Sequence, residues 1–393
     1  MPIARFIGVA LQRLNYPFEL EWIEGGSVGH IQVAMSGHQL YREPSFDFTP
    51  FIYPPLYYYV SALPSYVLGL GLLAPRLVSF ASILGCFALL ARWVRDETGD
   101  TAAGFAAAGL LAAVYQLTGL WMDLARVDSL FLFITLSANV LARSTHTVRR
   151  AALVGALLTA SCFTKQLGIP LALPALVFLT LRSFRLGVVA TLSAGATAAL
   201  GALVFGLSSH GWIFYYLFQL PAHHEVEWSR LLPSMQTYFL GVTLPLTVAG
   251  LALLCGFGFP GKNWKEWIYS ALFVFVGVTS SYLPYLKSGG YVNGLIPAYA
   301  ALSLAAGIQL GNLRRRKREP TAMLGVVGPA VFTALLLAYQ CAALAYDPNA
   351  ALPTPADLAA NEQALQRMKK LPQPLFVTAS AHWNRISQEH GVP

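Results

Sequence analysis

The sequence predicts an all-α, polytopic membrane protein with about eleven spans. Of its 393 residues, 56% are hydrophobic and only 11% are charged, and the mean hydropathy is +0.55. A soluble domain does not bury this much apolar surface, whereas bilayer spans of roughly 20 apolar residues do. The apolar residues also gather into separate segments, at 77–92, 101–120, 128–142, 151–164, 168–181, 187–207, 236–258, 267–286, 293–310 and 322–346.

Two further apolar stretches lie near the N-terminus. Residues 1–15 are short for a span, and we interpret them as a short or truncated first helix. Residues 55–73 contain a run of tyrosines, Pro64 and several glycines. This composition suits the membrane interface better than its centre. We therefore expect 55–73 to lie along the outer leaflet or to re-enter it.

The net charge of +8 is distributed unevenly between alternate loops. This asymmetry is the positive-inside signal, and it predicts that the more basic side faces the cytoplasm. A nucleic-acid surface would instead interleave basic residues with exposed aromatics on one face, so we expect no nucleic-acid partner. The loops assigned to the cytoplasm contain Arg92, Arg95, Arg143, Arg149, Arg150, Arg182, Arg185, Lys262, Lys265 and Arg314–Arg318.

The span order sets the side on which each acidic cluster lies. Counting backward from Arg314–Arg318 places Asp128 on the extracytoplasmic side. If 55–73 does not cross the bilayer, Glu24 shares this side. The loop around Glu24 is expected to form one or two short interfacial helices. The predicted units are a transmembrane module at 1–346, which includes a first outer loop at 15–75, and a small extracytoplasmic tail at 347–393.

An acidic and aromatic stretch opens the first outer loop. Glu19, Glu21 and Glu24 precede a Gly-Gly turn, although charged residues are rare in this chain. Ionised groups at the edge of a bilayer are costly and commonly carry chemistry. Glu24 stands directly before the turn, where a carboxylate can act as a general base toward a hydroxyl nucleophile. The alternative is a solvated acidic loop.

A second charged cluster begins the expected span 128–142. Asp123 and Arg126 are three residues apart, so they can form an ion pair on one helix face. The cluster then either anchors the helix end or binds a polar substrate or phosphate through Arg126, beside Asp128. Lys165 interrupts an apolar hairpin. It either snorkels to the interface or meets a lipid phosphate.

Two later loops carry further polar residues. The loop 208–235 contains His223, His224 and Arg230, which are either parts of a solvated loop or, for the histidines, metal ligands. Lys287 and Tyr291 flank a Ser-Gly-Gly turn. That turn is either a flexible link or a phosphate-facing loop. Motifs of soluble nucleotide-binding and hydrolytic enzymes are absent from the sequence.

The ordered set of motifs resembles the GT-C superfamily of membrane glycosyltransferases. The chain is similar to its family-39-like branch, which includes aminoarabinose and protein O-mannosyl transferases. Many relatives have an Asp-Glu pair in the first loop, where this chain has Ile23-Glu24. The resemblance rests on Ile23-Glu-Gly25, Tyr53-Pro-Pro-Leu-Tyr-Tyr-Tyr59, Arg76–Phe80, Asp123–Asp128, Phe163-Thr-Lys-Gln166 and Gly290–Tyr299.

The resemblance implies an inverting glycosyltransferase in the inner membrane, with its site on the extracytoplasmic side. The donor would be a polyprenyl-phosphate sugar, and the acceptor a glycan, lipid or protein hydroxyl. A divalent metal ion is implied as an optional cofactor. The resemblance implies Glu24 and Asp128 as catalytic residues, Lys165 as a contact of the lipid phosphate, and His224 and His223 as metal ligands. Beside these, we expect substrate contacts from Asp123, Arg126, Arg230, Lys287, Tyr291, Tyr53 and Tyr57.

Two other functions are compatible with charged groups among apolar spans. A transporter or flippase of lipid-linked sugars would also carry such groups. The sequence shows no inverted repeat, and its charges gather at one face instead of the midplane, which favours the enzyme. A non-catalytic membrane scaffold is the third alternative.

Overall fold

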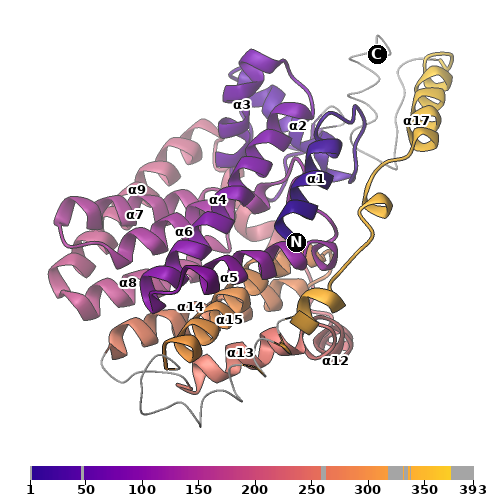
Figure 1. Ribbon diagram of the computed structural model, residues 1–393. Helices are drawn as coiled ribbons and strands as arrows, with labels where there is room; N and C mark the ends of the chain where they lie inside the picture. Colours follow the sequence, from indigo (N-terminus) through magenta and orange to yellow (C-terminus); the bar gives the residue numbers. More distant parts are fainter. Residues whose placement is uncertain are drawn as a thin grey trace.

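The computed structural model describes residues 2–45, 48–257, 263–316, 331, 335–336 and 338–372. Within these residues, regular structure is helical apart from one isolated antiparallel bridge between Val226 and Lys287, so the all-α class is confirmed. The longer helices, apart from the last of them, pack side by side as a bundle (Figure 1). They are α1 (Pro2–Leu14), α2 (Ile23–Met35), α3 (Leu56–Leu68), α4 (Leu73–Thr98), α5 (Thr101–Ala113), α6 (Val127–Arg143), α7 (Val148–Cys162), α8 (Gly168–Arg182), α9 (Phe184–Ser208), α13 (Leu244–Leu254), α14 (Trp264–Tyr285), α15 (Ile296–Arg316) and α17 (Pro355–Met368).

Short helical turns connect several of these helices. Most of them lie between α9 and α13, and the others follow α5, directly precede α15 or precede α17. The short α-helices are α10 (Trp212–Phe214), α11 (Leu220–Ala222) and α12 (Leu231–Met235), and the 3-10 or π turns are η1 (Gln116–Thr118), η2 (Tyr215–Gln219), η3 (Trp228–Arg230), η4 (Gln236–Leu240), η5 (Val292–Leu295) and η7 (Asn349–Ala351).

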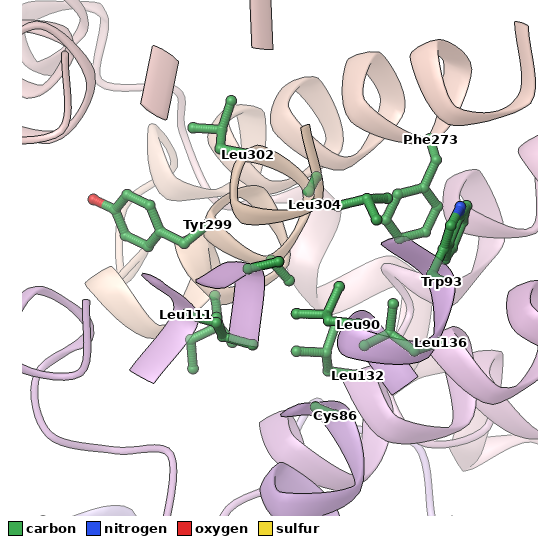
Figure 2. Close-up of a cluster of buried hydrophobic side chains, with 14 of the residues drawn as sticks. Cys86, Leu90, Trp93, Leu111, Leu132, Leu136, Phe273, Tyr299, Leu302 and Leu304 are labelled. Carbon is green, nitrogen blue, oxygen red and sulfur yellow. The ribbon is translucent and has the colours of Figure 1, made fainter. Parts of the chain in front are cut away.

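Helix α15 lies at the centre of the bundle. In the most apolar part of Val292–Arg315, 89% of the residues are buried. Small residues allow neighbouring helices to approach it, and a Cβ at Gly307 would lie 2.8 Å from side-chain atoms of Ala107 and Val94. Figure 2 shows leucines of α4, α5, α6 and α15 meeting in this core, beside Trp93 and Phe273.

Helix α9 lies at the periphery and packs closely on α7. A Cβ at Gly155 would lie 2.2 Å from the carbonyl oxygen of Ala190, so the contact requires glycine. Only 6% of the apolar window of α9 is buried, and Leu192 and Leu200 are exposed. An apolar surface of this length suits contact with lipid.

Among the described residues, four segments are long and apolar enough to cross a membrane: α4, α9, α14 and Val292–Arg315. A fifth candidate consists of Trp228–Leu240 and Leu244–Leu254, which are bent by 91° relative to each other. Helices α5 and α8 are apolar but shorter. The structure therefore supports a multi-pass membrane protein, and it does not confirm the count of eleven spans.

Several expected spans differ in length from the helices that form. The segment 101–120 is helical only to Ala113, because the chain turns through η1 and continues in a left-handed conformation at Gly119, where φ is +76°. Residues 128–142 and 151–164 correspond to α6 and α7, of 17 and 15 residues. Much of the expected span 322–346 lies outside the described residues.

The first outer loop contains short helices, as expected, but the expected Gly-Gly turn does not form, because Gly25 and Gly26 lie inside α2. Helix α2 begins beside the acidic stretch, and α3 covers the first part of the segment 55–73. Helix α3 ends at Leu68. Gly69, whose φ is +85°, then changes the direction of the backbone before α4 begins. Helix α17 stands away from the bundle in Figure 1 and contacts the segment after α1, where Asn361 Nδ2 donates a 3.2 Å hydrogen bond to the Tyr16 hydroxyl.

Candidate active site

A buried cluster of charged side chains lies where several helices begin. Glu24, Arg76 and Asp128 occupy the first turns of α2, α4 and α6. Lys165 lies just before α8, and Asn293 lies in η5, which leads into α15. Helix N-termini carry partial positive charge and therefore favour carboxylates and phosphates. The two acids implied by the family resemblance thus lie in one cluster.

Glu24 is fully buried and forms a bidentate ion pair with Arg76. Arg76 Nε donates to Oε1 at 2.8 Å, and Nη2 donates to Oε2 at 2.7 Å. The backbone N–H groups of Leu20 and Ala125 each donate to Glu24 at 2.8 Å. Glu24 therefore accepts four hydrogen bonds, which tie the first outer loop to α4 and to the segment before α6.

Arg76 also fixes the path of the chain after α1. Its Nη1 donates to the carbonyl oxygens of Arg13 at 3.1 Å and Tyr16 at 2.7 Å, and its Nη2 donates to that of Phe18 at 2.9 Å. The guanidinium thus satisfies three buried carbonyls besides Glu24. This geometry indicates a structural role for the pair.

Arg126 links two other acids of the cluster. Its Nη1 donates to Glu21 Oε2 at 2.5 Å, and its Nε donates to Asp128 Oδ2 at 3.2 Å. The guanidinium also lies over the Trp121 ring, 4.5 Å from the ring centroid. All three charged side chains are at least 96% buried. The expected pairing of Asp123 with Arg126 does not form, because Arg126 turns to Glu21 and Asp128.

Asp128 is held by two further groups. Lys165 Nζ donates to its Oδ1 at 2.5 Å, and Asn293 Nδ2 lies 3.1 Å from both carboxylate oxygens. Gln166 Nε2 donates to the Ile52 carbonyl at 2.5 Å, so the hairpin that carries Lys165 is anchored to the segment before α3. Lys165 points into the cluster and does not snorkel away from it.

Asp123 lies in a neighbouring contact with α1. The Tyr115 hydroxyl donates to Asp123 Oδ1 at 2.6 Å, and Arg13 Nη1 lies 3.3 Å from the same oxygen. Arg13 also contacts the Tyr115 hydroxyl. Burial raises the pKa of Asp123 above its ordinary value, because desolvation outweighs the attraction of Arg13. These contacts indicate a structural role for Asp123.

The pKa values of Glu21 and Glu24 are shifted in opposite directions. Burial raises the pKa of Glu21, since loss of water outweighs the attraction of Arg126. Burial also acts on Glu24, but the Arg76 guanidinium overcomes it and holds the pKa of Glu24 below its ordinary value. Among the described residues, no group donates a hydrogen bond to the buried Oε1 of Glu21. A raised pKa and a free lone pair are properties of a general base.

Tyr53 and Tyr57 belong to the segment that packs beside the cluster. The Tyr57 side chain is fully buried, and its hydroxyl contacts the Pro75 carbonyl at 3.0 Å and the Ser79 hydroxyl at 3.1 Å. The Tyr53 carbonyl accepts a 2.6 Å hydrogen bond from Tyr41. Tyr57 therefore acts in packing α3 against α4.

Arg230, Lys287 and Tyr291 come from two loops that pair with each other. The Glu227 N–H donates to the Leu286 carbonyl at 2.8 Å, next to the bridge between Val226 and Lys287. Arg230 forms an ion pair of 2.6 Å with Glu227, and Lys287 Nζ donates to the Pro221 carbonyl at 3.2 Å. Tyr291 lies 5.9 Å from Trp121 between ring centroids, and Trp121 in turn lies under the Arg126 guanidinium, so Tyr291 adjoins the ionic cluster.

The two histidines do not come together with other metal-binding side chains. His223 is exposed, and its Nδ1 lies 2.7 Å from the Gln219 carbonyl oxygen. Within the described ranges, no three His, Cys, Asp or Glu side chains form a group suited to a metal ion. The donor set around His223 and His224 therefore does not fit a metal site.

Sequence reasoning did not assign Arg13, Arg76, Asn293 or Tyr115 to the site. Arg76 carried a usable signal, because an ionisable residue at the start of an apolar segment requires a buried partner. Arg13 carried a similar signal, since it lies in the last turn of a mostly apolar helix. Asn293 and Tyr115 lack such a signal, because their roles depend on which helices become neighbours.

Comparisons with known proteins identify the fold. No protein-family model and no curated protein sequence matches the chain. The crystal structure of ArnT from Cupriavidus metallidurans bound to undecaprenyl phosphate matches with a TM-score of 0.61 and 14% identity, over 98% of this chain and 84% of that chain. Its apo structure matches with a TM-score of 0.53 and 17% identity, over the same shares. The chain therefore shares the fold of ArnT, which agrees with the fold expected from the sequence.

Proposed function

We propose that this chain is a membrane glycosyltransferase that transfers a sugar from a polyprenyl-phosphate donor to an acceptor hydroxyl. The observation that carries the proposal is the buried ionic cluster around Arg126, Asp128 and Lys165, on a fold shared with ArnT. That ArnT structure holds undecaprenyl phosphate, a lipid of the proposed donor class. The site would face the extracytoplasmic side, as the distribution of basic loops predicts.

Glu21 is the general base in this proposal, in place of the expected Glu24. The lone pairs of Glu24 are occupied by four donors, whereas Oε1 of Glu21 is unpaired among the described residues. The raised pKa of Glu21 strengthens it as a proton acceptor. Glu24 is assigned to the structural pair with Arg76, and it positions the segment that carries Glu21.

The proposed reaction is a single displacement. The acceptor hydroxyl gives its proton to Glu21 while its oxygen forms a bond to the anomeric carbon. The bond between that carbon and the phosphate oxygen breaks, and its electron pair leaves with the lipid phosphate. Attack opposite the leaving group inverts the anomeric centre. Phosphate is a good leaving group, so charge stabilisation suffices without a dedicated general acid.

Arg126 and Lys165 would stabilise the departing phosphate. Both contact Asp128, and Arg126 also contacts Glu21, so two carboxylates balance the two cations before the donor binds. Asp128 is thus a positioning residue, and a phosphate would compete with it for the two cations. Arg230 and Lys287 remain predicted phosphate contacts at the edge of the site. No step is assigned to a metal ion.

The test is a transfer assay with purified protein in detergent. The donors are undecaprenyl phosphates that carry a pentose or a hexose, and the acceptors come from an extract of envelope lipids and glycans. The wild-type protein should release undecaprenyl phosphate and label an acceptor. Glu21→Gln should lower the rate by about a hundredfold or more, the range of general acid-base catalysis. Asp128→Asn should also lower the rate, because it weakens the ion pairs that position Arg126 and Lys165.

A matched control variant and two alternative outcomes test the assignment of Glu21 as the base and of the protein as a transferase. Glu43→Gln removes an exposed acid of the same outer loop and should leave the rate unchanged. Full transfer by Glu21→Gln would refute the choice of base. Absence of transfer by the wild-type protein from every donor, together with lipid scrambling in vesicles, would instead favour a flippase.

A further inference from the structure

Three aromatic rings from separate segments lie against one another beside the ionic cluster. Tyr291 is the central ring, 6.5 Å from Trp22 and 5.9 Å from Trp121 between ring centroids. The corresponding interplanar angles are 61° and 58°. Trp22 directly precedes α2, Trp121 lies between α5 and α6, and Tyr291 directly precedes η5. We call these three residues the aromatic platform.

Each ring is tied to a member of the ionic cluster. Trp22 follows Glu21 in the chain, and Tyr291 lies two residues before Asn293, which binds Asp128. Trp121 lies under the Arg126 guanidinium, 4.5 Å from the Arg126 Cζ to the ring centroid. The same segments therefore carry the platform and the proposed chemistry.

The aromatic platform is partly exposed to solvent, whereas the ionic cluster is buried. The exposed fractions of Trp22 and Tyr291 are 48% and 49%, whereas the side chains of Glu21 and Arg126 are 4% and 3% exposed. Large half-exposed rings beside convergent polar groups are typical of sites that bind small ligands. Such rings supply a rigid apolar surface with little conformational entropy to lose on binding.

A sugar ring fits both parts of this arrangement. One face of a pyranose presents C–H groups, which pack on an aromatic ring, while its edge presents hydroxyls, which bind charged side chains. A bilayer anchor would also expose tryptophan and tyrosine. An anchor, however, has no need of a ring fixed by Arg126 inside the ionic cluster. The contact between Trp121 and Arg126 thus favours a ligand.

We propose that Trp22, Trp121 and Tyr291 bind the face of a sugar ring, which belongs either to the lipid-linked donor or to the acceptor. This proposal rests on the proposed glycosyl transfer and names the part of the substrate that the platform contacts. Trp22 and Tyr291 offer the open faces, and Trp121 holds Tyr291 in place next to Arg126.

Binding measurements with three kinds of probe test this proposal. The probes are undecaprenyl phosphate, undecaprenyl phosphate that carries a hexose or a pentose, and free methyl glycosides. If the platform binds the donor sugar, the sugar-bearing lipid should bind about tenfold more tightly than the bare lipid, or about 1.4 kcal/mol. Trp22→Ala should remove most of that difference and leave the affinity for the bare lipid unchanged. Trp22→Phe should retain it.

Tyr291→Leu is the second variant, and it should also remove the difference if Trp22→Ala fails to fold. Trp228→Ala is the matched control, because Trp228 is an exposed tryptophan of another loop and lies outside the platform. If the platform binds the acceptor, Trp22→Ala should weaken free methyl glycosides only. Both outcomes support a sugar site and distinguish the two sources.

Two outcomes overturn the proposal. One is an affinity for every sugar-bearing probe that is the same in wild type, Trp22→Ala and Tyr291→Leu. The other is equal loss of membrane insertion in Trp22→Ala and Trp228→Ala with unchanged sugar affinity, which indicates an interfacial anchor. Failure of the proposed transfer would appear differently, as wild-type protein that binds sugars at the platform but does not bind undecaprenyl phosphate.

Discussion

Replacement of Glu24 by Gln tests the division of roles between the two glutamates. Arg76 donates two hydrogen bonds to Glu24 and three to backbone carbonyls, and both side chains are at least 99% buried. Glu24→Gln removes the negative charge and leaves the guanidinium buried without its counter-ion. Breaking a buried pair in this way costs about 3–5 kcal/mol. We therefore expect a large loss of stability.

The loss should depend on pH and on Arg76. The pKa of Glu24 is lowered in the folded protein, so its stabilisation is present above the unfolded pKa and is lost as the pH falls through the folded pKa. Glu24→Gln should lack this acid-dependent component. Arg76→Gln in the same chain removes the uncompensated charge, and the double-mutant cycle should give a coupling of about 1–3 kcal/mol.

Thermal unfolding in detergent, followed by size-exclusion retention, measures these effects. Glu43→Gln is the control, and a surface change of this kind alters stability by about 0.5 kcal/mol at most. The fraction of Glu24→Gln that stays folded should retain transfer per folded molecule. Normal stability combined with complete loss of transfer would refute the structural role and restore Glu24 as the base.

Two further predictions concern the base and the core. Glu21 must be ionised to act as base, and its pKa is raised, so the rate of transfer should fall as the pH drops through a value above the ordinary glutamate pKa. Glu21→Asp should keep this fall in rate at low pH, at a reduced overall rate. A rate independent of pH would count against the assignment. Gly307→Ala should destabilise by about 1–3 kcal/mol because its Cβ meets two side chains at 2.8 Å and the Ala103 carbonyl oxygen at 3.1 Å. Gly195→Ala, which has open space, should be neutral or stabilising by about 0.5–1 kcal/mol in the same unfolding assay.

The sequence predicted the class of the fold and the location of the site better than the roles within it. Apolar segments and acidic clusters indicated a helical membrane protein and brought Glu24 and Asp128 to one place. The sequence could not show that Arg76 would form an ion pair with Glu24, because the two residues are 52 positions apart and their pairing depends on how α2 packs against α4. Glu21 stood in the same stretch, but its unpaired Oε1 and its raised pKa depend on tertiary contacts that the sequence does not show.

Helix lengths were harder to predict for a similar reason. Hydropathy located the segment 101–120, but the helix ends where the chain turns at η1 and Gly119. The bend of 91° between Trp228–Leu240 and Leu244–Leu254 likewise depends on a backbone break that apolar composition does not reveal. Composition records the preference for lipid, whereas helix ends depend on local backbone geometry.

The central position of α15 has a consequence for biogenesis. This helix begins at Ile296, so most of the chain has been synthesised before it emerges. Until then, the faces of α4, α5 and α14 that it covers have no partner among the helices already made. The earlier helices pack against one another, as α4 does against α5 and α6, but the surface that α15 covers stays exposed until α15 inserts. Chains stopped before Ile296 should accordingly be substrates for membrane quality control.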